Sequence, residues 1–185
     1  MKRIYSLVLV LLLTLSLLGC NSNTIIAPEK KSPNVLEKKA PDVEAGIIGY
    51  IMKIEDARFL VVSQVMQDFS STDGVKEYYD AIWFSNDPKD VEVGDKVKVW
   101  YDEVLTSYTG QSEAKHIEVI SSQKPNDANL TESEALKKAL NNEKIITDVI
   151  VVVKSIEYDK QADKWNIELK ETWGEKTYHI QIEDK

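Results

Sequence analysis

The sequence predicts a mainly β protein with a small α+β unit, namely a five-stranded OB-like barrel followed by an α-β-β-β domain. Two observations carry this prediction. Short apolar runs rich in β-branched residues recur between residues 46 and 120, separated by polar loops of unequal length. A helix-start signal and three further strand signals then occupy residues 131–185.

The strands predicted for the barrel domain, residues 45–122, are Gly46–Ile54, Arg58–Ser63, Tyr79–Ser85, Asp95–Tyr101 and Lys115–Ile120. The fourth alternates cleanly: Val97, Val99 and Tyr101 share one face, and Lys96, Lys98 and Trp100 share the other. Such alternation is typical of a strand with one face in a core.

A polar linker, residues 123–130, leads to the C-terminal domain, residues 131–185. Thr131 and Glu134 match a capping box, so we expect a helix that ends at Asn141-Asn142. The strands expected after it are Ile145–Tyr158, Trp165–Leu169 and Tyr178–Ile182. A unit of this size has a marginal core by itself, so we expect it to dock on the barrel.

The N-terminus has the features of a secretory signal peptide, residues 1–19. Lys2 and Arg3 precede the uncharged run Ile4–Leu18, which is short for a membrane-spanning helix. Leu17-Leu18-Gly19-Cys20 resembles the bacterial lipobox, whose cysteine is diacylated after cleavage. The sequence therefore predicts an extracytoplasmic protein attached to the cell membrane by a diacylglyceryl group on Cys20.

Residues 20–44 are predicted to be the lipidated cysteine and a flexible tether. Asn, Ser, Pro, Lys and Glu dominate this segment, which is too polar to order itself. As a flexible coil it would span about 25–30 Å, enough to hold a domain clear of the membrane surface.

The region from Gly46 to Ile120 resembles the YobA-like extracytoplasmic domain of Firmicute lipoproteins, a family of unknown function. The segments that carry the resemblance are Gly49-Tyr50-Ile51, Leu60-Val61-Val62-Ser63, Ala81-Ile82-Trp83, residues 94–101 and Ser107-Tyr108-Thr109-Gly110-Gln111. Thr109 stands where the family's loop usually has proline. The resemblance implies a fold and a location but no activity.

Composition excludes several functions. A net charge of −8 disfavours nucleic-acid binding, because a polyanion requires a basic face. The single cysteine excludes a disulfide framework and a cysteine-based zinc site. His116 and His179 lie in predicted strands, and neither the glycines nor the acids match phosphate-loop or calcium-loop spacing. We therefore predict no catalytic residue, no metal site and no cofactor.

Aromatic side chains are the better candidates for a site. Trp83-Phe84 and Trp100-Tyr101 are adjacent pairs on strands, so one ring of each pair points away from the barrel core. The residues predicted to bind a sugar or a peptide are Trp83, Trp100, Lys96, Lys98, Tyr108 and Gln111. Trp100 would be an exposed ring beside two lysine side chains. The alternative is that the outward rings are covered by the C-terminal domain or by the loop Gln64–Tyr78.

These observations predict a non-catalytic binding or interaction module at the cell envelope. One alternative is a hydrolase of cell-wall or glycan material that uses paired carboxylates, because acidic residues are abundant. Another is a structural or inhibitory envelope protein whose C-terminal domain grips a partner.

Overall fold

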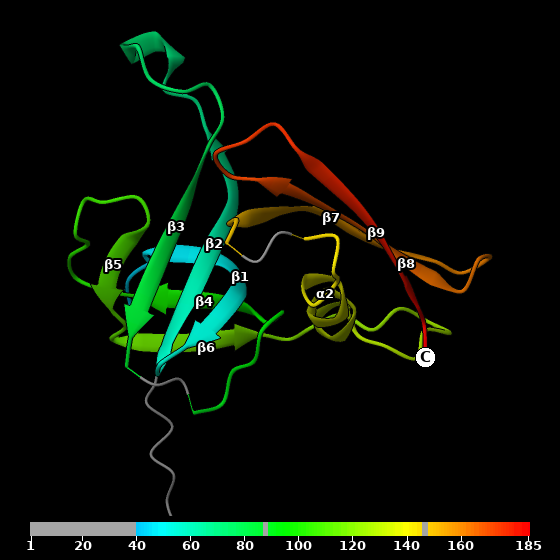
Figure 1. The fold of residues 1–185 in the computed structure, drawn as a ribbon. Coiled ribbons are helices and arrows are strands. Elements are labelled where there is room, and N and C mark those ends of the chain that lie inside the picture. The colour runs from blue at the N-terminus through cyan, green and yellow to red at the C-terminus, as the bar shows by residue number, and fades with distance from the viewer. Residues whose placement is uncertain (1–39, 87–88, 146–147) are drawn as a thin grey trace, which may run out of the picture. The chain divides into compact units, whose positions relative to one another are not determined.

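The computed structural model describes residues 40–86, 89–145 and 148–185. Their strands form a six-stranded sheet and a three-stranded sheet, and the chain is mainly β (Figure 1). The predicted signal peptide, Cys20 and most of the predicted tether lie outside the described residues. No helix in the described part of the chain is long and apolar enough to cross a membrane.

The six-stranded sheet has the order β5-β3-β2-β1-β4-β6. Its strands are β1 (Ile47–Glu55), β2 (Arg58–Gln67), β3 (Tyr78–Ser85), β4 (Lys96–Trp100), β5 (Gly110–Glu113) and β6 (His116–Ile120). All neighbours are antiparallel except β3 and β5, which are parallel. The β2–β3 hairpin extends beyond the sheet and carries a short 3-10 helix, η1 (Ser70–Thr72), at its tip (Figure 1).

The sheet has six strands and is not a closed barrel, whereas the sequence predicts a five-stranded OB-like barrel. An additional strand, β5, precedes the predicted fifth strand, and β5 and β6 occupy opposite edges of the sheet. The chain changes edge at two residues: Ala114 N–H donates to the Ser85 carbonyl at 3.2 Å, and Lys115 N–H donates to the Trp100 carbonyl at 2.8 Å. The polar sequence of β5, GQSE, lacks the apolar alternation that indicates a strand.

The C-terminal part contains α2 (Glu132–Leu140), β7 (Val151–Asp159), β8 (Lys164–Glu171) and β9 (Thr177–Glu183). The three strands form an antiparallel meander in the order β7-β8-β9. The predicted capping box is confirmed: the Glu134 N–H donates to the Thr131 hydroxyl, and the Glu134 carboxylate accepts from the Thr131 N–H. The helix ends at the predicted asparagine, whereas β7 begins six residues later than predicted, at Val151.

Each face of the six-stranded sheet has its own core. One face buries a cluster that includes Ile51, Phe59, Val61, Phe84 and Val99. The other face packs on α2 and the three-stranded sheet through the cluster Tyr50, Met52, Leu60, Val62, Leu136, Val152, Trp165 and Leu169, among others. The two sheets therefore share a hydrophobic core. We call the line along which the two sheets meet the seam.

Candidate functional site

The structure places Trp83 and Gln111 side by side, because β3 and β5 pair in parallel with these residues in register. Trp83 is partly buried on the face that carries the shared core, as its alternation with buried Phe84 predicts. The Arg58 guanidinium lies 5.2 Å from the centre of the Trp83 ring. Trp83 is therefore a partly covered ring with a cationic neighbour.

The expectation that Trp100 is an exposed ring is wrong. Its side chain is only 8% exposed, and its indole N–H donates to the Val43 carbonyl at 2.8 Å. The His116 ring covers it further, with ring centres 5.1 Å apart. The segment before β1, which contains Val43, therefore lies over Trp100 on β4. It covers this ring on the face of β4 that alternation alone assigns to solvent.

Lys96 and Lys98, on the same face as Trp100, are engaged with other partners. Lys96 donates to the Gln64 side chain at 3.0 Å and lies 5.1 Å from the centre of the Tyr50 ring. Lys98 pairs with Glu118 at 2.9 Å. Because β1 and β2 separate β4 from β3, the structure does not bring Lys96, Lys98 and Trp100 together with Trp83 and Gln111.

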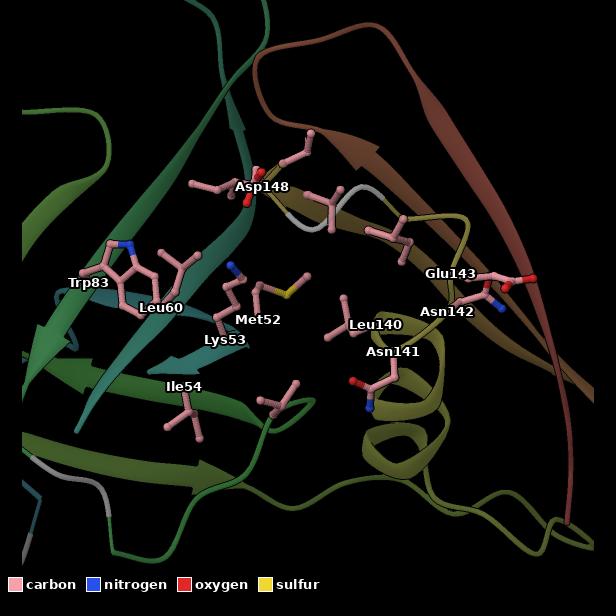
Figure 2. A pocket seen from close by; sticks show the side chains of 15 residues that line it. Met52, Lys53, Ile54, Leu60, Trp83, Leu140, Asn141, Asn142, Glu143 and Asp148 are labelled. Atoms are coloured by element: carbon pink, nitrogen blue, oxygen red, sulfur yellow. The ribbon is translucent and has the colours of Figure 1, made fainter. Parts of the chain in front are cut away.

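A pocket of about 810 Å³ lies between the six-stranded sheet and the end of α2 (Figure 2). Figure 2 shows Met52 and Lys53 between Trp83 and Leu60 on one side and Leu140 on the other. Its wall also includes Ile145 and Asp148. Residues 146 and 147, which connect them, lie outside the described ranges. We therefore assign no function to this pocket.

Four aromatic rings contact one another in a row near the tip of the β2–β3 hairpin, at the seam between the two sheets. Phe69 contacts Tyr78 with ring centres 5.5 Å apart, Tyr78 contacts Tyr108 at 5.8 Å, and Tyr108 contacts Trp173 at 4.7 Å. We call Phe69, Tyr78, Tyr108 and Trp173 the aromatic row. The row joins the hairpin, the β4–β5 loop and the β8–β9 turn, so it brings a predicted residue, Tyr108, next to an unpredicted one.

The aromatic row borders a pocket of about 650 Å³, which we call the aromatic cleft. The hairpin contributes Met66, Val75, Lys76, Glu77 and Tyr78. The three-stranded sheet contributes Lys154 and Lys170, and its β8–β9 turn contributes Thr172, Trp173, Gly174 and Glu175. Trp173 is 63% exposed, and Met66 and Val75 are exposed as well. Such a concentration of exposed apolar side chains at one pocket is typical of an interaction surface.

A cluster of charged groups lies at the base of the cleft. The Glu77 carboxylate pairs with Lys154 at 3.3 Å and with Lys170. Tyr79 donates to the same carboxylate at 2.5 Å and accepts from Lys154 at 2.5 Å. The hydrogen bonds from Lys170 and Tyr79 lower the pKa of Glu77 from 4.5 to about 2. Glu77 is thus a carboxylate that stays ionised, positioned between two ammonium groups.

The pH dependence of stability follows from this lowered pKa. Glu77 should stabilise the fold fully above about pH 4.5 and lose that contribution as the pH falls toward about 2. We expect Glu77→Gln to lower the free energy of unfolding at pH 7 by about 1 kcal/mol, since these side chains are partly exposed. Urea denaturation at several pH values should show the difference between wild type and variant shrinking below pH 4.5. A difference independent of pH would contradict the assignment.

The Tyr108 hydroxyl is buried at the seam and lacks a hydrogen-bond partner among the described residues. Thr172 and Trp173 are its polar neighbours, but neither meets hydrogen-bond geometry. Burial raises the pKa of Tyr108, so the hydroxyl stays protonated. Tyr108 therefore acts as packing for the Trp173 ring.

Sequence reasoning missed Trp173, Lys154, Lys170 and Glu77. The available signal for Trp173 was its place in the turn Trp173-Gly174-Glu175. A large ring in a turn has no alternation that directs it into the core, so it is a candidate for exposure. The lysines and Glu77 carry no such signal, since they are far apart in the chain and alternate as ordinary surface residues.

Both histidines lie outside the lining of the aromatic cleft. His179 is exposed on β9, 3.9 Å from Glu168, and His116 packs against Trp100. Within residues 40–86, 89–145 and 148–185, no group of three or more His, Cys, Asp or Glu side chains could hold a metal ion. The aromatic cleft itself combines the exposed Trp173 ring with the ion pairs of Glu77, Lys154 and Lys170.

No curated protein and no solved structure matches the chain significantly. A family model does match part of it, over β1 to β6. The matched region supplies the hairpin side of the aromatic cleft, whereas Lys154, Lys170 and Trp173 lie outside it. Residues 48–121 thus match the model of the family described as "Protein of unknown function (DUF3221)".

Proposed function

We propose that the protein is a lipid-anchored extracytoplasmic lipoprotein whose described part is a non-catalytic binding module of the cell envelope. The aromatic cleft is the observation that carries this proposal. It joins exposed apolar side chains with a fixed polar base, and its volume of about 650 Å³ is that of a small-ligand site.

The charge cluster favours binding over hydrolysis. A general acid works best with a pKa near the working pH, and the Glu77 carboxyl, with a pKa of about 2, is ionised throughout the neutral range. Hydrogen bonds from Tyr79, Lys154 and Lys170 already reach both oxygens of Glu77. The cleft thus presents donors and acceptors in fixed positions rather than a proton to transfer.

We also propose that the six-stranded sheet is an OB-like domain, similar to the YobA-like extracytoplasmic domain. The support for this proposal is the parallel pairing of β3 with β5 and the handover of the chain from β3 to β4 at Ala114 and Lys115. A sheet whose two edge strands are consecutive in the chain must be strongly curled. Loops at one end of such a sheet are common ligand positions.

The anchor is proposed from the sequence alone, through Cys20 at the end of the signal segment. Cys20→Ala should abolish labelling of the protein by a fatty-acid probe and release it from the membrane or leave it unprocessed. Labelling and membrane fractionation of cells expressing each form measure this. Unchanged labelling of the variant would overturn the anchor.

The binding role is tested by retention of envelope material. Immobilised full-length protein in detergent should retain envelope components, and Trp173→Ala should retain less than half as much. Val119→Ala, an exposed apolar side chain on β6 outside the aromatic cleft, is the matched control. Equal retention by wild type and Trp173→Ala would refute the assignment to this cleft.

A further inference from the structure

We infer that the aromatic cleft binds an uncharged oligosaccharide, with one pyranose ring stacked on Trp173. The inference rests on the proposed binding function and adds the chemical class of the ligand. It follows from three properties of the cleft: a fixed exposed ring, a base that both donates and accepts hydrogen bonds, and ammonium groups that are already paired.

The Trp173 ring is both available and fixed. It is 63% exposed, yet Tyr108 holds it by an edge contact, with ring centres 4.7 Å apart and planes at 82°. A ring positioned in advance loses little conformational freedom when a ligand binds. A pyranose presents a flat face of C–H groups, and a flat aromatic surface is its natural partner.

The base of the cleft matches sugar hydroxyls. A hydroxyl both donates and accepts, so it needs acceptors and donors near one another. Glu77 Oε1 already accepts from Tyr79 and Lys154, but Oε2 accepts only from Lys170 and can accept again, and each ammonium group has three donors, so both lysines can still donate. Glu77, Lys154 and Lys170 line the same cleft as Trp173.

Charge argues for an uncharged ligand. Lys154 and Lys170 share the single Glu77 carboxylate, so the three groups keep a net charge of only +1, on a chain whose net charge of −8 repels an anionic ligand. An apolar peptide side chain is disfavoured for a different reason, because it would remove water from the charged groups without pairing them. A neutral saccharide avoids both costs.

The experiment measures binding of cellohexaose, N-acetylchitohexaose and maltohexaose to full-length protein in detergent, by calorimetry and by tryptophan fluorescence. At least one of the three should bind saturably. Trp173→Ala should weaken that binding about ten-fold or more, and Trp173→Tyr should restore part of it. The thermal midpoint of Trp173→Ala should match that of wild type, because the ring is mostly exposed. Val119→Ala should bind as wild type does.

Absence of saturable binding for all three saccharides would overturn the inference, as would equal binding by wild type and Trp173→Ala. Binding of an extended apolar peptide in place of the saccharides, lost in Trp173→Ala, would also overturn it. Retention of envelope material that depends on Trp173, with no saccharide bound, would leave the proposed function intact and remove only the saccharide.

Discussion

Replacing Trp165 with alanine should lower the free energy of unfolding by about 3–5 kcal/mol, the range for large buried aromatic side chains. Trp165 is 2% exposed and lies in the core that the two sheets share. Its ring contacts Tyr158, and its indole N–H donates to the Asp184 carboxylate at 3.0 Å. The substitution removes core volume and one of the hydrogen bonds that stabilise a buried carboxylate.

The role of Asp184 makes Trp165→Phe an informative second variant. The same carboxylate accepts from the backbone N–H groups of Asn129 and Leu130, which tie the segment before α2 to the end of β9. Burial raises the pKa of Asp184, but these hydrogen bonds and the one from Trp165 outweigh it and leave the pKa lowered. Phenylalanine keeps most of the ring and removes one donor, so we expect a smaller loss.

Urea denaturation of full-length protein measures both variants, with Gln161→Ala, an exposed side chain in the β7–β8 turn, as the control. The slope with urea should stay constant, since the same surface is exposed on unfolding. If Trp165→Ala behaved like Gln161→Ala, the shared core would not exist as described.

The shared core extends beyond the region that the family model matches. The matched region ends at residue 121, before α2 and the three-stranded sheet that cover its Tyr50, Leu60 and Val62. Burial of apolar surface is the main favourable term in folding. We infer that the C-terminal part stabilises the matched domain by covering this face, in addition to contributing half of the aromatic cleft.

Local patterns predicted much of the fold. Alternation in Asp95–Tyr101, Trp165–Leu169 and Tyr178–Ile182, and the apolar run within Ile145–Tyr158, identified strands that the structure contains. Alternation also separated Trp83 from Phe84 correctly: Phe84 is fully buried on one face, and Trp83 is partly covered on the other. The capping box fixed the start of α2 because it depends on residues only three positions apart.

Features that depend on distant segments could not be predicted. β5 is a strand because β3 lies beside it, not because GQSE favours an extended chain. The aromatic cleft combines Glu77 with Lys170, ninety-three positions apart in sequence. Of the predicted site residues, Tyr108 reaches the aromatic row and Trp83 pairs with Gln111, while the β4 residues Lys96, Lys98 and Trp100 have other partners.

The second large loss of stability is expected at Trp100. The sequence pattern predicts an exposed ring at this position, whereas the structure buries it. Trp100→Ala should cost about 3 kcal/mol in the free energy of unfolding, since the ring is buried. It should also free the segment before β1, whose Val43 carbonyl accepts from the Trp100 indole at 2.8 Å. Limited proteolysis should therefore cut before Gly46 faster in the variant.

Trp100→Phe separates these two effects. The phenyl ring can still pack against His116, but it has no N–H for the Val43 carbonyl, so cleavage before Gly46 should accelerate with a smaller loss of stability. An alanine variant with the thermal midpoint of wild type would show that Trp100 is exposed in solution. The surface of Lys96, Lys98 and Trp100 would then be restored as a candidate binding site, because only an uncovered ring can be removed at so little cost in stability.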